Sequence, residues 1–130
     1  NWAGAPYKAQ QVIRRILNEQ YSSRVNGLPG NDDLGSMGAW YVFASIGLFP
    51  EIPGVGGFSV NSPVFRKIVL HLPEGDVIIK GGDEKKEYIH SLSLDERRWR
   101  ALGSIGRIYI GGRPWNINYP GSRIRRGELG

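Results

Sequence analysis

Three consecutive polar residues, Asn31, Asp32 and Asp33, carry the clearest candidate chemistry in this sequence. They stand just before an apolar segment with helical spacing, so their side chains are expected at the positive end of a helix. That position favours the ionised carboxylate, the form that a general base or a metal ligand needs. Asn and Asp are also preferred helix caps, so the motif by itself leaves both interpretations open.

Aromatic and histidine side chains are the other candidates for binding or catalysis. Four aromatic residues could form a platform for a sugar ring or pack in a core, and Trp2 is the best candidate for a sugar contact. The four are Trp2, Tyr7, Trp40 and Tyr41. His71 and His90 fall in predicted strands without metal-ligand spacing around them, so we interpret them as ordinary strand positions.

Two helices are predicted to position the Asn-Asp-Asp motif. Residues 6–21 show the spacing of an amphipathic helix, with Pro6 suited to its first turn. Its apolar face holds Ala9, Val12, Ile13, Ile16 and Leu17, and its polar face holds Lys8, Gln11, Arg14, Arg15 and Asn18. The second helix runs from about Leu34 to Gly47 and is apolar around most of its circumference, so it should be buried against neighbours outside this sequence.

The second half of the sequence predicts strands. Residues 65–72 and 76–80 alternate on either side of Pro73-Glu74-Gly75, as in a hairpin. Residues 87–94 read as a third strand, and residues 107–110 form a weaker candidate. Residues 51–57 are expected to be a linker, residues 58–110 a β-rich unit, and residues 111–130 a Gly/Arg-rich tail.

Composition excludes some classes of protein and leaves others open. No apolar run approaches the roughly 20 residues that a membrane-spanning helix needs, so no membrane partner is expected. Residues 1–64 carry four basic and four acidic groups, whereas residues 65–130 carry thirteen and eight. The basic, aromatic second half keeps a nucleic-acid-binding module as an alternative, although a solvated tail is the more ordinary explanation. The sequence begins with Asn1 and not with an initiator Met, so any signal peptide is expected to lie upstream or to have been removed.

The run GLPGNDDLGSMGAWYVFASIGLFP at residues 27–50 resembles the signature of the family 92 α-mannosidases, a group of glycoside hydrolases. The segment NWAGAPYK at residues 1–8 resembles the start of the preceding helix in this family. Asn61-Ser62-Pro63-Val64-Phe65, followed by Lys67, resembles the family's entry into its last β segment. The resemblance covers about residues 1–99 and is poor after Trp99.

The resemblance implies an α+β fold made of the last helical hairpin of an (α/α)6 barrel, residues 1–50, followed by a sandwich-like β-rich unit. It further implies an inverting, calcium-dependent exo-α-mannosidase, acting on α-1,2 linkages of N-glycans or mannans. The expected partners are a mannose-containing oligosaccharide and a missing N-terminal part of the same enzyme. By the same resemblance the enzyme is expected to be secreted or periplasmic. A non-catalytic module that binds carbohydrate or nucleic acid is the alternative.

The resemblance also implies roles for individual residues. Asp33 matches the family's catalytic base and lies by the calcium ion. Asn31 stands where some members have Asp, and is expected to orient the attacking water. Asp32 is expected to cap the helix or to support the substrate site, and Trp2 to lie near the sugar. The general acid and the remaining calcium ligands lie outside this sequence, so the isolated chain is expected to be inactive and to bind calcium poorly.

Overall fold

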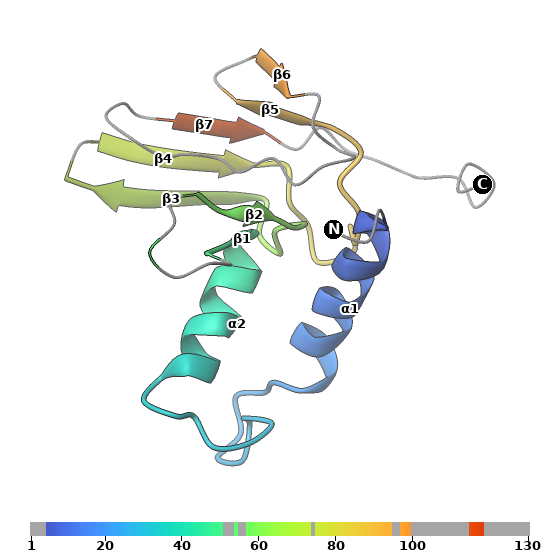
Figure 1. Cartoon of the computed structure of the whole chain (residues 1–130), viewed down its shortest axis with the longest axis vertical. Helices are drawn as coiled ribbons and strands as arrows, with labels where there is room; N and C mark the ends of the chain where they lie inside the picture. Colours follow the sequence, from blue (N-terminus) through green and yellow to red (C-terminus); the bar gives the residue numbers. More distant parts are fainter. Residues whose placement is uncertain are drawn as a thin grey trace.

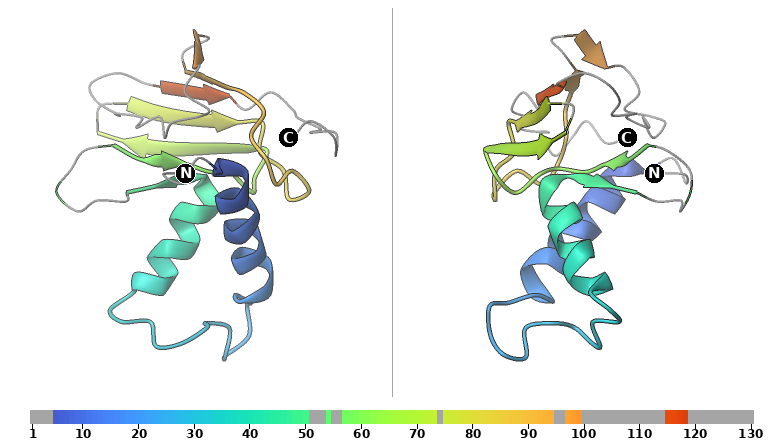
Figure 2. Two further views of the ribbon diagram at one scale, coloured as in Figure 1. Left: turned by 45° about the vertical axis from the view of Figure 1, so that its right-hand side comes forward. Right: turned by 90° about the vertical axis from the view of Figure 1, so that its left-hand side faces the viewer.

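The computed structural model describes residues 5–50, 54, 57–73, 75–94, 97–99 and 115–118. Within this part of the chain, two helices lie side by side beneath a five-stranded sheet (Figure 1). The views in Figure 2 show that the loop joining the helices lies at their ends far from the sheet. Trp2, the strand predicted at residues 107–110 and most of the predicted linker and tail lie outside the described residues.

The two helices form where the hydrophobic pattern predicts them. Helix α1 spans Pro6–Glu19, with Pro6 in its first turn, and helix α2 spans Ser36–Ile46. Helix α2 begins two residues later than predicted, because Leu34 and Gly35 adopt left-handed backbone angles that a right-handed helix cannot contain. Neither helix is long and apolar enough to cross a membrane.

Within the described residues, seven short strands form two sheets. Strands β1 (Leu48–Phe49) and β2 (Ser59–Val60) pair with each other, and the larger sheet has the order β3-β4-β7-β5-β6. Its strands are β3 (Lys67–Leu72), β4 (Gly75–Lys80), β5 (Leu92–Leu94), β6 (Arg97–Trp99) and β7 (Trp115–Asn118). The antiparallel pairing of Leu72 with Gly75 confirms the predicted hairpin between β3 and β4. The mixture of helices and strands confirms the α+β class, while the barrel and sandwich assignments stay predictions.

The hydrophobic core of the β part lies between the two sheets and continues onto the end of α2. Its buried members are Leu48, Val77, Ile79 and Leu92, with Ile46, Phe58, Val60, Ile68, Leu70 and Ile89 packed around them. Val77 and Ile79 alternate with the exposed Asp76 and Lys80, so β4 buries one face only. Each fully buried aliphatic side chain contributes about 1.5–3 kcal/mol, so this cluster fixes the position of the sheet on α2.

Two predictions about the strands are wrong in part. The strand predicted at residues 87–94 is reduced to β5, and His90 lies in a bend rather than in a strand. The reason is that the Ile89 backbone N–H donates to Oε1 of Gln10 on α1, at 2.7 Å, instead of to a neighbouring strand. Trp115–Asn118 fell in the predicted tail, but it forms β7 between β4 and β5. This pairing joins residues far apart in sequence, which local composition does not encode.

Arg14 is the main departure from the predicted polar face of α1. Its side chain is buried, and the residue is only 2% exposed. Its Nη2 donates to the carbonyl oxygens of Ser62, Pro63 and Lys86 at 3.2, 3.3 and 2.9 Å, and to Oγ of Ser62 at 3.2 Å. Arg14 therefore ties α1 to the segments before and after the β3-β4 hairpin. Burial lowers the pKa of its guanidinium, while Glu87, Asp83 and Glu84 oppose that shift.

Candidate active site

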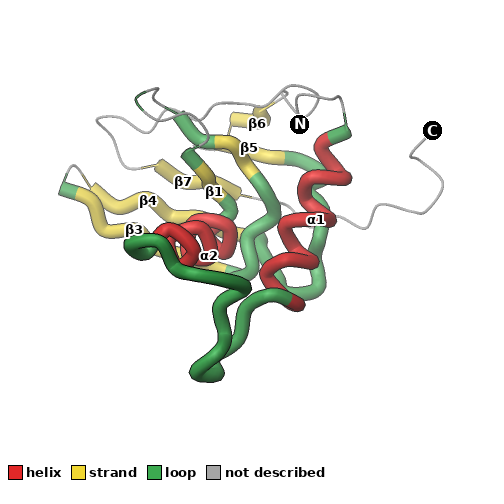
Figure 3. The backbone as a smooth tube through the Cα atoms, turned by 60° about the horizontal axis from the view of Figure 1, so that its bottom comes forward, coloured by secondary structure: helices red, strands yellow, loops and turns green. Residues whose placement is uncertain are grey.

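The Asn-Asp-Asp motif lies in the loop between α1 and α2, which is folded back on itself. The Ser22 N–H donates to the Gly27 carbonyl and the Gly27 N–H donates to the Arg24 carbonyl, each at 3.0 Å. A Cβ atom on Gly27 would lie 1.9 Å from the Ser22 carbonyl oxygen, so only glycine fits this turn. Figure 3 shows the loop extending beyond the helices on the side away from the sheet. The Asn-Asp-Asp motif therefore follows a turn whose backbone conformation is fixed by hydrogen bonds.

Asp32 is bound to the first turn of α2. Its Oδ1 accepts a hydrogen bond from the Gly38 N–H at 3.1 Å, and its carbonyl oxygen accepts bonds from Ser36 Oγ at 2.9 Å and the Met37 N–H at 3.3 Å. The bonds from Met37 and Gly38 satisfy two N–H groups that the start of a helix leaves without partners. The structure therefore confirms a capping role for Asp32, and its substrate-binding role stays a prediction.

Asp33 has a different environment although it is the next residue. Its side chain is exposed, and within the described residues its carboxylate makes no hydrogen bond or ion pair. Its backbone is left-handed with φ 48°, followed by Leu34 at φ 63° and Gly35 at φ 89°. For the two non-glycine residues this conformation costs about 1–2 kcal/mol each. Asn31 is exposed as well, so the loop turns two polar side chains outward on either side of the anchored Asp32.

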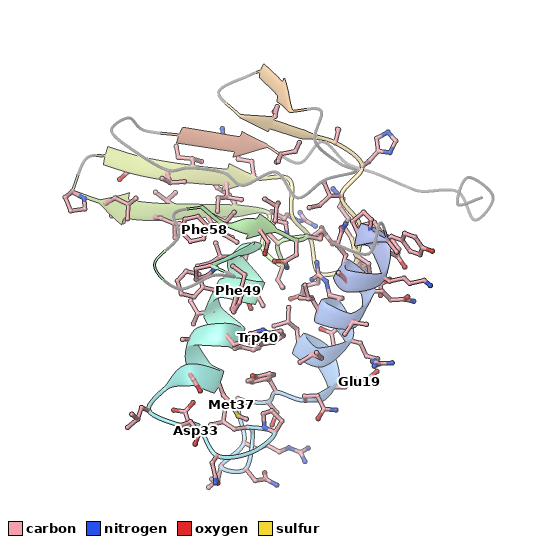
Figure 4. The ribbon with its side chains drawn as sticks, viewed as in Figure 1. Glu19, Asp33, Met37, Trp40, Phe49 and Phe58 are labelled. Carbon is pink, nitrogen blue, oxygen red and sulfur yellow. The ribbon has the colours of Figure 1, made fainter. Side chains whose placement is uncertain are left out.

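An aromatic cluster holds this end of the helical pair together. The Tyr21 hydroxyl donates to the Met37 carbonyl at 3.2 Å, and the Tyr21 ring stacks on Trp40 with a centroid distance of 5.7 Å. Its ring also contacts Tyr41 at a centroid distance of 5.0 Å. Figure 4 shows Trp40 between the helices, with Met37 and Asp33 farther toward the loop. The Trp40 side chain is therefore half-buried against Tyr21, and it does not form an open surface on which a sugar ring could stack.

Tyr21 was not recognised from the sequence as part of the site. It reads as the last residue of the first helical pattern, and only the fold places it against the start of α2. Burial and the negative charge of Asp32 both raise the pKa of its hydroxyl, so it remains a hydrogen-bond donor at neutral pH. Tyr21, Tyr41 and Gly38, with the serines Ser22 and Ser23, line a pocket of about 310 Å³ beside the loop.

Comparison with known proteins identifies the family. The family model for the catalytic domain of glycosyl hydrolase family 92 matches residues 1–113. The chain belongs to glycoside hydrolase family 92. A family 92 inverting mannosidase from Bacteroides thetaiotaomicron is 29% identical, with a TM-score of 0.75, over 90% of this chain and 16% of that one.

Two further proteins resemble this chain in fold or in sequence. A family 92 α-mannosidase from the same bacterium, solved with mannoimidazole, shares the fold with a TM-score of 0.75 at 24% identity, over 88% of this chain and 15% of its own. An uncharacterized secreted glycosidase from Arthroderma benhamiae is 33% identical over 73 residues, which are 56% of this chain. The chain spans 9% of that curated relative and 15–20% of the similar solved structures.

The family 92 loop does not form a calcium site from the described residues alone. No group of three or more His, Cys, Asp or Glu side chains in the described part of the chain could hold a metal ion. Calcium takes six to eight oxygen ligands, and Asp33 carries the only exposed carboxylate in the described loop between α1 and α2. Figure 4 shows Glu19, at the end of α1, well apart from Asp33. His71 pairs with Asp76 at 2.8 Å in the β3-β4 hairpin and belongs to no such group.

Proposed function

We propose that this chain supplies the general base of an inverting exo-α-mannosidase, and that Asp33 is that base. The observation that carries the proposal is the contrast between two adjacent carboxylates. Asp32 is bound to the start of α2, whereas Asp33 is exposed on a left-handed backbone without a bonding partner among the described residues. A general base needs its carboxylate oxygens available to accept a proton from water. The membership in family 92 supports glycoside hydrolysis as the reaction.

In this mechanism Asp33 removes a proton from a water molecule that attacks the anomeric carbon of the terminal mannose. The C–O bond to the leaving sugar breaks while a carboxylic acid protonates the leaving oxygen. In an inverting enzyme the two carboxyl groups lie about 6.5–9.5 Å apart, which leaves room for the water. Because the Asp32 carboxylate is hydrogen-bonded to α2, the general acid is expected to come from another part of the enzyme. Asn31 orients the water by hydrogen bonding, since an amide cannot take its proton.

Calcium, Trp2 and Asp32 complete the proposed site. We assign Asp33 as one calcium ligand, with further oxygen ligands supplied by residues outside the described part of the chain, because the described loop is too poor in ligands. A bound calcium ion would contribute positive charge beside the sugar hydroxyls. Trp2 is proposed to contact the mannose ring, and Asp32 to support the substrate site through the loop. No step of the proton transfer is assigned to the metal.

The complete enzyme is proposed to be longer than this chain, with an N-terminal part that forms the rest of the catalytic site. This is supported by the small share of its relatives that the chain spans and by the exposed apolar residues of α2. Mannose-containing oligosaccharides with terminal α-1,2 linkages are the proposed substrates. Secretion is proposed because the curated relative is described as a secreted glycosidase.

The test compares Asp33→Asn with Asp32→Asn in the complete enzyme, using α-1,2-mannobiose and an aryl α-mannoside. Asp33→Asn is expected to lower kcat by at least about a hundredfold, because general-base catalysis contributes about 10²–10⁴. Asp32→Asn should lower thermal stability slightly and change kcat far less than Asp33→Asn does, since an amide oxygen can still accept the Gly38 N–H but without the charge that strengthens the bond. Wild-type enzyme should release β-mannose first and lose activity on chelation of calcium. Wild-type turnover in Asp33→Asn would reject the proposed base.

A further inference from the structure

Tyr21, just after α1, is hydrogen-bonded to the first turn of α2, and the loop that carries Asp33 is anchored to the same turn. Its hydroxyl donates to the Met37 carbonyl at 3.2 Å. The Met37 N–H in turn donates to the Asp32 carbonyl at 3.3 Å, and the next N–H, that of Gly38, donates to the Asp32 carboxylate at 3.1 Å. Asp32 and Tyr21 are therefore both hydrogen-bonded to the backbone of the first turn of α2.

The ring of Tyr21 fixes this contact from a second direction. It stacks on Trp40 with an angle of 14° between the ring planes, and it meets Tyr41 at an angle of 40°. Aromatic pairs of this kind contribute about 0.5–1.5 kcal/mol beyond their buried area. Because Trp40 and Tyr41 both belong to α2, the hydroxyl and the ring restrain the same helix relative to α1.

The conformation of Asp33 needs such a restraint. Asp33 and Leu34 are left-handed, and backbone of this kind persists only where the surrounding structure enforces it. On one side of Asp33 lies Asp32, anchored to the first turn of α2, and on the other side α2 begins at Ser36. If that turn moved relative to α1, the loop could relax and Asp33 would change its direction.

We propose that Tyr21 is a positioning residue for the general base, acting through its hydrogen bond to Met37 and its stacking on Trp40. Tyr21 is not assigned a contact with substrate or water. It holds the first turn of α2 so that Asp32 stays anchored and Asp33 stays in its left-handed, outward conformation. This inference rests on the proposed function of Asp33, and it adds a residue that the hydrophobic pattern alone assigns to the end of a helix.

The experiment uses Tyr21→Phe and Tyr21→Leu in the complete enzyme, with Tyr88→Phe as the matched control. Tyr21→Phe keeps the ring and removes only the hydroxyl. Tyr88→Phe removes another half-buried hydroxyl, on the segment that leads into β5. We expect Tyr21→Phe to lower kcat about tenfold with little change in KM, because a misplacement of about 1 Å can cost about 10²-fold and the retained ring should limit the displacement of Asp33 to less than that. Tyr21→Leu should lower kcat further, and Tyr88→Phe should keep wild-type kcat.

Two readouts separate positioning from loss of folded enzyme and from failure of the proposed function. The loss in kcat should be the same for mannobiose and for an aryl mannoside with a good leaving group, because water must be activated in both, and the thermal midpoint of Tyr21→Phe should stay near wild type. Unchanged kcat in Tyr21→Phe, a change confined to KM, or a loss that disappears with the aryl substrate would overturn the proposal for Tyr21. Full activity of Asp33→Asn would instead overturn the proposed base.

Discussion

At the scale of single residues, Arg14 shows how a charged side chain can serve as a cross-link in this fold. Four oxygen acceptors surround its Nη2, while its Nη1 is buried without a hydrogen-bond partner among the described residues. A buried guanidinium without a paired carboxylate is costly unless its hydrogen bonds offset the loss of water. The carbonyl groups of Ser62, Pro63 and Lys86 provide that offset, and each of them also accepts a hydrogen bond from a second donor.

Replacing Arg14 with alanine is expected to destabilise the protein by about 2 kcal/mol, because hydrogen bonds to a charged donor contribute about 1.5–3 kcal/mol, while each of the three carbonyls keeps a second donor. Arg15→Ala is the control, since Arg15 is the next residue on α1 and is exposed. That change should cost less than about 0.5 kcal/mol. The midpoint of urea-induced unfolding of the complete enzyme measures both. Equal shifts for the two variants would show that the cross-link contributes little.

Only those features of the candidate site that depend on neighbouring residues in the sequence could be predicted. Asn31, Asp32 and Asp33 stand out because polar residues precede an apolar helix, but the pattern does not tell which carboxylate is bound to the helix. That distinction depends on the backbone angles of Asp33 and Leu34, which no periodicity encodes. Tyr21 and Arg14 escaped prediction because their partners, Met37 and Ser62, are 16 and 48 residues away in the sequence.

At the scale of elements, the end of α2 shows how the helical part is joined to the strands. Gly47 follows α2 with φ 88°, and its carbonyl accepts the Asn61 N–H at 3.0 Å. The Asn61 side chain also donates from Nδ2 to the Ala44 carbonyl at 2.9 Å, and the Val64 N–H donates to the Ser45 carbonyl at 3.0 Å. The last carbonyl groups of α2 therefore bind the segment that leads into β3, which aligns helix and sheet.

Substitution of Gly47 by alanine should disturb this junction more than the same change at Gly54. Both glycines are left-handed, but a Cβ on Gly47 would lie 2.7 Å from the Asn61 carbonyl oxygen, whereas a Cβ on Gly54 would meet no atom of the described residues within 4 Å. We expect a cost of at least about 2 kcal/mol at Gly47 and about 1 kcal/mol at Gly54, where only backbone strain remains. Thermal unfolding of the two variants gives the comparison. A larger loss at Gly54 would contradict the close approach at Gly47.

The elements themselves were predictable to different degrees. Helices α1 and α2 and the β3-β4 hairpin rest on local periodicity and on a turn signal, and all three form near their predicted bounds. Strand β7 pairs in parallel with β4 from 35 or more residues away, and such long-range pairing leaves no local pattern. The strand predicted before β5 failed because Gln10 takes the Ile89 N–H, a contact between distant parts of the chain.

At the scale of the whole molecule, the rest of the described chain covers only a small part of the apolar surface of α2. Its eleven residues contain only two buried ones, Ala44 and Ser45, whereas Tyr41 is 42% and Val42 is 53% exposed. Val12 on α1 is 43% exposed as well. A soluble protein that exposes such side chains on neighbouring helices presents an interaction surface. The proposed N-terminal part of the enzyme is the expected partner, since the chain spans only 15–20% of similar structures.

Val42→Glu tests this surface because its expected effects differ between two forms of the protein. In the complete enzyme the new carboxylate would be buried against the N-terminal part and left without a partner, which should cost several kcal/mol and lower both stability and activity. In the isolated chain Val42 already faces water, so the same change should alter stability by less than about 0.5 kcal/mol and reduce self-association. Thermal unfolding and analytical ultracentrifugation of both forms measure these effects. If Val42→Glu leaves the complete enzyme unchanged, this face of α2 is solvent-exposed there, and the proposed site around Asp33 must be completed from another side.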